Sequence, residues 1–347
     1  MPLTQHRRKP DIENLYKVLR REKPDRTVLF ELFLNDSLHK TLTGRELSKT
    51  AVWAGLDHLK LIIDAYAAAG YDYTWTKGSD FSFPVDREKQ DGKSSVSLNE
   101  GCRITDWESF ESYKWQDPEN CDYSMLSEIS NYLPDGMKLM IMSPGGVLEN
   151  AISLAGYENL CTFLFEEPEL VKAIFDNVGR RLLKHYEIAF SFDCIGLVMA
   201  NDDWGFKTQT FLSHNHMREY VFPWYKKIVA AAHSRKLPVI LHSCGHFAPI
   251  MDDIIDTIGF DGRHSYEDTI TPVEEAYEKW HDRIAIIGGM DVNFLVQSAE
   301  EAIAARVRKM LDRASDKGAY ALGSGNSIPE YIPREKYFAM INAALNY

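Results

Sequence analysis

The sequence predicts a single (β/α)8 barrel of the TIM type, with an N-terminal extension and a long excursion after the second strand. Three observations support this fold class. Eight short apolar runs of the kind found in strands occur along the 347 residues, and almost all are followed by a helix-like segment. Polar residues gather directly after these runs, where the carboxyl ends of barrel strands carry the active site. The length suits one barrel, so residues 1–347 are assigned to one domain.

The predicted elements alternate along the whole chain. The strands are expected at residues 27–33, 71–76, 138–143, 194–200, 239–241, 260–267, 284–289 and 318–322. The helices are expected at residues 11–21, 51–70, 157–165, 168–190, 216–236, 299–314 and 333–346. No internal repeat other than this alternation and no low-complexity tract is present.

The composition describes an acidic chain with enough apolar residues for a large core. Hydrophobic residues make up 45%, aromatic residues 12%, and the formal charge is −12. This charge, without a basic run, argues against nucleic acid and anionic membranes as partners, and no run of about 18 apolar residues predicts a membrane span. Five scattered cysteines without a Cys-x-x-Cys pair indicate a reducing compartment. Residues 1–10 lack the apolar core of a signal peptide, so we expect a cytoplasmic protein.

The N-terminal elements follow from the spacing of apolar residues. Residues 11–21 carry Leu15, Val18 and Leu19 at helical spacing. The apolar run 27–33 contains Glu31, which is either a site residue that points inward or part of the polar face of an edge strand. The helix over 51–70 has small residues at its end and a terminal glycine typical of a C-cap, and the second strand follows it.

The long excursion covers residues 79–100. It is polar and irregular, with Asp91-Gly92 as a turn, and loops of this length are often functional lids. The aromatic residues that follow either line a pocket or pack an additional cap, which is the commoner use. These residues are Trp107, Phe110, Tyr113 and Trp115.

The third and fourth strands end in residues suited to a site. The third ends in Ser-Pro-Gly-Gly at 143–146. The fourth is followed by Asp202 and Asp203, and paired carboxylates after a strand suit acid–base or metal chemistry. The alternative is a helix N-cap or a turn, which Asp also favours. Because a buried strand precedes the pair, we favour the site. Pro223 is expected to interrupt the helix over 216–236.

The fifth strand, 239–241, ends in the most informative motif, His-Ser-Cys-Gly. Its unbroken apolar run is typical of a parallel strand buried on both faces. His242 and Cys244 are two residues apart, so on a strand they point to the same side. Imidazole and thiolate are zinc ligands, although two ligands do not complete a zinc shell. Cysteine is also among the residues most often buried for packing alone.

The last three strands add further candidates at their ends. His264 and Glu267 lie near the end of the sixth strand, and Asp291 follows the seventh. The eighth strand precedes Gly-Ser-Gly-Asn-Ser at 323–327, which contains Ser324 and Asn326. We expect all of these residues at one face of the barrel.

Taken in order, these motifs resemble the uroporphyrinogen decarboxylase superfamily, and in particular its methyltransferase-like branch. The ordered set covers most of the chain and is specific, whereas each piece alone is weak. The resemblance implies a TIM-barrel-like fold, which agrees with the strand pattern. The matching pieces are Phe30–Phe33, Ser97–Glu100, Asp202–Gly205, Met217–Tyr220, Pro223, Lys226, His242–Gly245, Gly288–Asp291, Gly323–Ser327 and Ile332–Pro333.

The resemblance also implies zinc and a corrinoid partner. That branch moves methyl groups between a small substrate, a corrinoid carried by a partner protein, and an acceptor thiol. It binds zinc through His-x-Cys and a distant Cys near the last strand. His242 and Cys244 match the first two positions, but the third falls at Ser324. Either another residue completes the shell or the metal is absent. Zinc accepts carboxylate oxygen, and the candidates are Glu267, Asp203 and Glu31.

The leading hypothesis is a zinc-dependent methyltransferase in which zinc acts as a Lewis acid. Asp202 or Asp203 would orient His242 through a hydrogen bond or shuttle a proton. Asn326 would hydrogen-bond the substrate. The predicted roles are metal binding for His242, Cys244 and Glu267, catalysis for Asp202, Asp203 and Asn326, and substrate binding for Glu31, His264, Asp291 and Ser324.

Two other functions stay open. A cofactor-independent decarboxylase of a carboxylated, tetrapyrrole-like substrate needs a cationic patch. Arg263 and Lys207 are possible contributors but form no cluster in the sequence. The decarboxylase motif Arg-Gln-Ala-Gly-Arg-Tyr is missing, and residues 71–79 show no counterpart of its catalytic Asp motif. A non-catalytic barrel that only binds a small molecule or a corrinoid protein would have lost its polar strand ends, which are present here.

Overall fold

The computed structural model describes residues 2–4, 6, 8–47, 55–85, 98–99 and 101–347. Parts of three features predicted from the sequence lie outside these described residues. Residues 51–54 of the predicted helix over 51–70 lie outside the described residues, as do residues 86–97 and 100 of the excursion. Ser97 and Glu100 of the family-like motif are therefore not described either.

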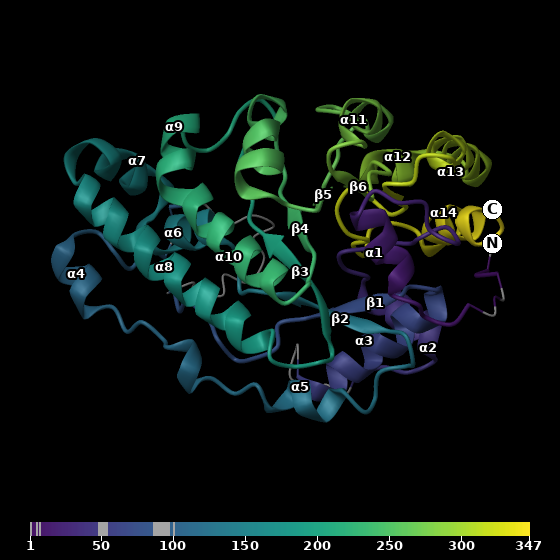
Figure 1. Cartoon of the computed structure of the whole chain (residues 1–347), viewed down its shortest axis with the longest axis horizontal. Coiled ribbons are helices and arrows are strands. Elements are labelled where there is room, and N and C mark those ends of the chain that lie inside the picture. Colours follow the sequence, from purple (N-terminus) through teal and green to yellow (C-terminus); the bar gives the residue numbers. More distant parts are fainter. Residues whose placement is uncertain (1, 5, 7, 48–54, 86–97, 100) are drawn as a thin grey trace.

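The centre of the molecule is a curled sheet of seven parallel strands, in which each strand pairs with the next one along the chain (Figure 1). This curled parallel sheet is consistent with a barrel of the TIM type. Its strands are β1 (Tyr73–Thr76), β2 (Lys138–Met142), β3 (Ile195–Asn201), β4 (Val239–His242), β5 (Gly262–His264), β6 (Ala285–Ile287) and β7 (Tyr320–Ala321). They confirm seven of the eight predicted strands, with shifts of a few residues at the ends.

The register of the sheet places three polar side chains in a row. His242, the last residue of β4, lies opposite Asn201 of β3 and opposite His264 of β5. The strands themselves are apolar and almost fully buried, as expected for parallel strands covered on both faces. The polar residues of three adjacent strands therefore meet at the carboxyl edge of the sheet.

The prediction of a strand over residues 27–33 is wrong. Leu29 makes one parallel bridge to Leu322, next to β7, and no strand forms. On the side facing β1, the Tyr73 hydroxyl accepts a hydrogen bond from the Glu31 amide (2.8 Å) and donates one to the Glu31 carbonyl (2.5 Å). The phenol thus occupies backbone groups that a strand would pair with its neighbour. Phe30 stacks on the Tyr73 ring with 5.0 Å between centroids, so residues 28–32 fill the gap between β7 and β1.

Helices surround the sheet, with α8 and α10 packed side by side and α13 and α14 beside the two termini (Figure 1). All the predicted helices are confirmed in the residues that the structure describes. They are α1 (Glu13–Leu19), α3 (Leu56–Ala69), α7 (Tyr157–Glu166), α8 (Pro168–Ala189), α10 (Phe222–Ser234), α13 (Glu300–Ala314) and α14 (Arg334–Leu345). Further helices not predicted are α2 (Asp36–Thr43), α4 (Trp107–Ser112), α5 (Ser124–Ile129), α6 (Val147–Ala155), α11 (Val273–Trp280) and α12 (Val292–Gln297).

The predicted interruption near Pro223 is confirmed as a change of helix type. The short helix α9 (His214–His216) continues into a π-helical turn over Met217–Val221, and α10 starts with Pro223 in its first turn. Proline is accepted there because the first amides of a helix have no partner inside it.

The aromatic residues after the excursion pack against each other as a small cap. Trp115 contacts Phe110 and Tyr113, with ring centroids 5.7 and 4.7 Å apart, and the Arg181 guanidinium lies 4.9 Å from its ring centroid. The packing alternative left open by the sequence is the one observed.

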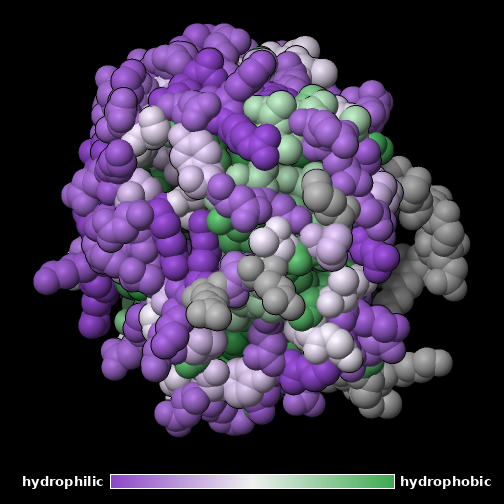
Figure 2. All heavy atoms as spheres, turned by 90° about the vertical axis from the view of Figure 1, so that its right-hand side faces the viewer, coloured by the Kyte–Doolittle hydropathy of each residue, from purple (hydrophilic) through white to green (hydrophobic). Residues whose placement is uncertain are grey.

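The face formed by α2, α12, α13, α14 and the termini is mostly hydrophilic, with hydrophobic atoms confined to small areas (Figure 2). Within the described part of the chain, no helix is both long enough and apolar enough to cross a bilayer.

Candidate metal centre

Three side chains with metal-binding atoms converge where β3 and β4 end. One ligand atom each from Asp203, His242 and Cys244 lies within 4.8 Å of the other two. The two loops are tied together directly, because Asp203 Oδ1 accepts a hydrogen bond of 2.8 Å from the Cys244 amide. A thiolate, an imidazole and a carboxylate form a donor set suited to zinc, and three protein ligands with one open position are typical of a catalytic zinc site.

His242 is oriented by a second histidine, not by a carboxylate. Its Nδ1 lies 2.7 Å from Nδ1 of His264, whose Nε2 lies 3.3 Å from the Ser324 carbonyl. Burial lowers the pKa of His242 to about 4 and that of His264 well below its usual value, so both rings are neutral at pH 7. A carbonyl only accepts, so His264 carries its proton on Nε2 and accepts at Nδ1 from His242. This arrangement leaves Nε2 of His242 with a lone pair for a metal.

The Cys244 thiol lies among groups that disfavour its charge. Burial, followed by the negative charge of Asp203, raises the thiol pKa to about 12. Two weak contacts surround the sulfur, one from Asn326 Nδ2, which donates at 3.4 Å, and one with the Ser265 hydroxyl at 3.4 Å. Ser265 has a φ of +85°, an uncommon backbone conformation for a residue with a side chain. A bound cation would stabilise the thiolate, so the residues present fit a metal ion.

Ser324 contacts Glu31 and is not directed at the candidate centre. The family resemblance places the third zinc ligand at this position. The Ser324 hydroxyl donates to Glu31 Oε1 at 2.5 Å and its amide donates to Oε2 at 3.1 Å. Its carbonyl accepts from His264. Ser324 therefore connects the buried Glu31 carboxyl to the histidine pair. Glu31, predicted to bind substrate, is fully buried, and this burial raises its pKa to about 8.

We expect Glu31→Gln to change how stability depends on pH. The folded-state pKa of about 8 lies above the usual 4.5, so the native protein holds this proton more tightly. The resulting stabilisation is complete below about pH 4.5 and falls by about 1.4 kcal/mol per pH unit until it is lost above pH 8. Glutamine has no such proton. Its side-chain oxygen can accept from the Ser324 amide, and its NH2 group can donate to the Ser324 hydroxyl oxygen. Urea unfolding from pH 5 to 9 should therefore show a shallower decline for the variant than for the wild type.

The control for this measurement is Glu166→Gln, which changes an exposed glutamate of α7. It should follow the wild-type curve. Parallel pH curves for the wild type and Glu31→Gln would mean that Glu31 is already ionised at neutral pH.

Asp202, predicted to be catalytic, is fully buried beneath the N-terminus of α6. Its carboxylate accepts hydrogen bonds from the Leu148 and Glu149 amides at 2.9 and 2.8 Å, and from Trp204 Nε1 and the Tyr225 hydroxyl at 2.8 Å each. These partners use its acceptor capacity, and the helix dipole also favours a negative charge there. A side chain on Gly146, the N-cap of α6, would collide with Asp202. The helix-capping alternative therefore describes the position of Asp202.

Glu149 is a member of this region that the sequence analysis missed. It lies in the first turn of α6, where its Oε2 accepts from the Gly146 amide at 3.1 Å. Burial, followed by the charges of Asp202 and Asp203, raises its pKa to about 8, so it holds a proton at neutral pH beside the candidate centre. Glu149 lies three residues after Gly146, the N-cap of α6, as in a capping box. This spacing after Gly-Gly was a sequence signal that could have located the start of α6.

A cavity of about 840 Å³ lies beside the centre, lined by the loops that follow β5, β6 and β7. Asn326 connects the two, because it lines the cavity and donates to Cys244 Sγ. Glu267 also lines it, but its carboxylate pairs with Lys207 (3.1 Å) and it does not belong to the group around His242. Asp203 is the carboxylate at that position. Asp291 accepts from the Phe294 amide as the N-cap of α12 and from the Asp268 amide.

The structure thus joins most of the predicted site residues into one chain of contacts. The connected residues are Glu31, Ser324, His264, His242, Cys244, Asp203 and Asn326. Asp202, Glu267 and Asp291 take up the separate arrangements described above. Sequence reasoning placed His264 in the site but missed its pairing with His242.

Comparisons with known proteins agree with this fold. The family model of uroporphyrinogen decarboxylase (URO-D) matches residues 100–347. A methyltransferase from Methanosarcina mazei superposes with a TM-score of 0.67 at 14% identity, over 95% of this chain and 97% of that one. A Listeria monocytogenes protein assigned as a vitamin-B12-independent methionine synthase has a TM-score of 0.47 at 13% identity, over 92% and 98%. No curated protein is significantly similar in sequence. At these identities the first structure supports the fold alone.

Proposed function

The chain belongs to the uroporphyrinogen decarboxylase family, and from this premise we propose that it is a zinc-dependent methyltransferase. It would move a methyl group between a small substrate and a corrinoid carried by a partner protein. The observation that carries the proposal is the convergence of Asp203, His242 and Cys244 within 4.8 Å at the carboxyl edge of the sheet. The order of family-like motifs supports the corrinoid partner.

Asp203, His242 and Cys244 would hold the metal. Zinc in this position supplies Lewis acidity to the substrate heteroatom that gains or loses the methyl group. The pair formed by His264 and the Ser324 carbonyl keeps His242 in the tautomer with a free Nε2. The fixed tautomer removes the need to reorganise the imidazole when a ligand binds.

The neighbouring residues would position the substrate and accept or donate the proton that methyl transfer releases or requires. The Asn326 amide lies between the thiol and the cavity, where it can hydrogen-bond a substrate and fix its distance from the centre. Methyl transfer to a thiol or hydroxyl releases the proton of that group, and transfer from a methylated substrate requires one. The carboxyl group of Glu149 is protonated at neutral pH, and in its ionised form it is a proton acceptor beside Asp203.

The test combines metal removal with a transfer assay. Purified protein is analysed for zinc, stripped with a chelator and reloaded. Each form is then incubated with methylcobalamin and a panel of thiols, and loss of the methyl–cobalt bond is followed by absorbance. We expect transfer with at least one thiol by the zinc form, loss of transfer on stripping and recovery on reloading.

A matched variant and two contrary outcomes complete this test. Cys161→Ala removes a cysteine of α7 outside the centre and should keep zinc and activity. Full activity of the stripped protein would contradict the zinc part of the proposal. Zinc-loaded protein that transfers no methyl group from methylcobalamin to any thiol would contradict the methyl-transfer part and favour a binding barrel.

The charges around the cavity disfavour the decarboxylase alternative. Among the described residues that line the cavity, the one cationic side chain is Lys207, which is paired with Glu267. Arg263 is buried, with its guanidinium carbon 5.0 and 4.5 Å from the ring centroids of Phe247 and Tyr266. In the part of the chain that the structure describes, a substrate with many carboxylates would meet acidic side chains here without a cationic cluster to offset them.

A further inference from the structure

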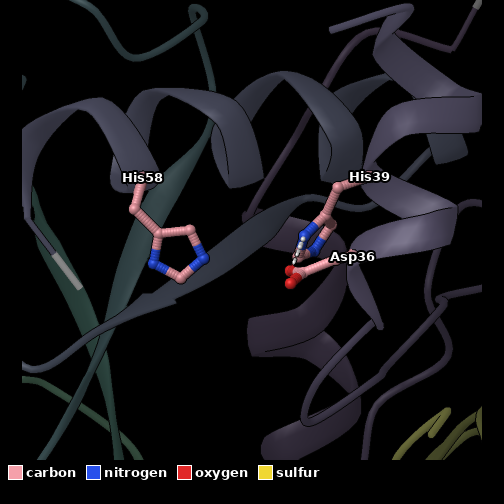
Figure 3. A group of neighbouring side chains, drawn as sticks. All are labelled: Asp36, His39 and His58. Carbon is pink, nitrogen blue, oxygen red and sulfur yellow. Dashed lines mark ion pairs between the residues drawn. The ribbon is translucent and has the colours of Figure 1, made fainter. Parts of the chain in front are cut away.

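A second group of potential metal ligands lies apart from the candidate centre, between α2 and α3. Asp36 and His39 belong to α2, and His58 belongs to α3. One ligand atom from each lies within 4.8 Å of the other two. Figure 3 shows the Asp36 carboxylate and both imidazole rings directed into the same space between the two helices. None of these residues takes part in the contacts around His242.

Within the group of Asp36, His39 and His58, the evidence for a missing ligand comes from His39. Its side chain is 3% exposed, and neither ring nitrogen makes a hydrogen bond. The nearest opposite charge is Asp36, with 3.5 Å between His39 Nδ1 and Asp36 Oδ1. Buried polar groups in native proteins are almost always paired, because an unpaired one loses its hydration without compensation. A metal ion would supply the missing partner.

The geometry suits a divalent transition metal with open coordination positions. Asp36 and His39 are three residues apart, so they lie on the same face of α2, and α2 packs on α3. The side chain of Asp36 is 86% exposed, so the group is closed on the histidine side and open to solvent at the carboxylate. Two imidazoles and one carboxylate with open positions are ligands of zinc and of iron(II).

The histidines are also in a state that binds metal. Burial lowers the pKa of both His39 and His58, and that of His39 falls to about 4. Neutral imidazole is the form that coordinates a metal, so no proton has to leave at neutral pH.

We propose that Asp36, His39 and His58 form a second metal site that binds a divalent transition metal ion and ties α2 to α3. This site does not depend on the proposed function, because it shares no ligand with the centre at Cys244. Its effect is structural, since bound metal links two helices that flank the segment around Glu31 and strand β1.

The test counts zinc ions by equilibrium dialysis of the full chain in four forms. The wild type should bind two zinc ions, and Asp36→Ala should bind one. Because Asp36 is exposed, its replacement leaves the core intact. The matched control is Asp57→Ala, which removes another exposed aspartate from the first turn of the neighbouring helix and should still bind two. His242→Ala/Cys244→Ala, which lacks the first centre, should bind one.

The affinity of the remaining site is then measured in the His242→Ala/Cys244→Ala background. Loss of a group that only orients a metal ligand typically lowers metal affinity by roughly 10- to 100-fold. Adding Asp36→Ala or His39→Leu, each of which removes a ligand, should lower the zinc affinity by more than this. In chelator, His39→Leu should unfold at no lower temperature than its parent, because it replaces an unpaired buried ring by an apolar side chain.

Cobalt(II) distinguishes the two sites in the wild-type chain. Only the centre at Cys244 gives a thiolate-to-cobalt charge-transfer band, so cobalt at the second site adds ligand-field absorbance without that band. If the wild type binds a single zinc that Asp36→Ala does not remove, or if the double variant binds none while folded, the second site is refuted. If the wild type binds one zinc and Asp36→Ala removes it, the second site stands and the first centre fails.

Discussion

Cys244→Ala should abolish stoichiometric zinc at the centre near His242 and lower methyl transfer by at least about 100-fold, a loss greater than that typical of groups that only orient metal ligands. The sulfur is one of three converging ligand atoms, and its two remaining neighbours, Asn326 and Ser265, offer no replacement of comparable affinity. Alanine removes the ligand without adding bulk. Zinc content and the initial rate with methylcobalamin measure the effect.

The neighbouring ligand gives a graded version of the same experiment. Asp203→Asn keeps one neutral oxygen as a weaker ligand and loses the carboxylate charge, so zinc affinity should fall, but by less than in Cys244→Ala, which removes the ligand atom altogether. Cys161→Ala serves as the cysteine control. Cys244→Ala protein that retains both its zinc and its activity would show that this group is a packed cluster and not a metal centre.

Asp202→Ala should lower the free energy of unfolding by about 3–5 kcal/mol, because four donors lose a buried charged acceptor. These donors are the Leu148 and Glu149 amides, Trp204 Nε1 and the Tyr225 hydroxyl. The N-terminus of α6 loses its negative partner at the same time. Urea unfolding at pH 7 measures the change.

The adjacent Asp203 is the natural comparison. Asp203→Asn should change the unfolding free energy of metal-free protein by less than about 1 kcal/mol, because the amide oxygen can keep the hydrogen bond from the Cys244 amide. A loss of activity in Asp202→Ala protein that is as stable as the wild type would return Asp202 to the catalytic group.

Most of the sheet could be predicted because each strand is a short apolar run between turn residues. The failure at residues 27–33 has a specific cause. The run has strand composition, but Tyr73, more than forty positions away, uses its hydroxyl to bind both backbone groups of Glu31. No local pattern reveals a side chain that replaces a neighbouring strand. Helix α2 did have a local signal, since Asn35 caps it by accepting from the Leu38 amide.

The candidate centre could be predicted only in part from the sequence. His242 and Cys244 were identified because their spacing places them on one side of a strand. Asp202 and Asp203 were indistinguishable, since both follow the same strand and only the path of the loop turns one under α6 and the other toward Cys244. His39 and His58 form no motif, because nineteen positions and a helix boundary separate them. Only the packing of α2 on α3 brings them together.

The way residues 28–32 close the gap between β7 and β1 affects where the native state opens locally. One backbone bridge at Leu29, the hydroxyl groups of Tyr73 and Tyr66 and the contacts of Glu31 with Ser324 hold residues 28–32 in place, whereas neighbouring strands of the sheet are joined by backbone ladders. Local opening costs least where the fewest buried bonds must break. Fluctuations of the native state should therefore begin at this seam, and they would withdraw Glu31 from Ser324 while β3 and β4 stay folded. We therefore expect opening of residues 28–32 to remove the contact of Glu31 with Ser324, whose carbonyl accepts from His264, while the sheet stays folded.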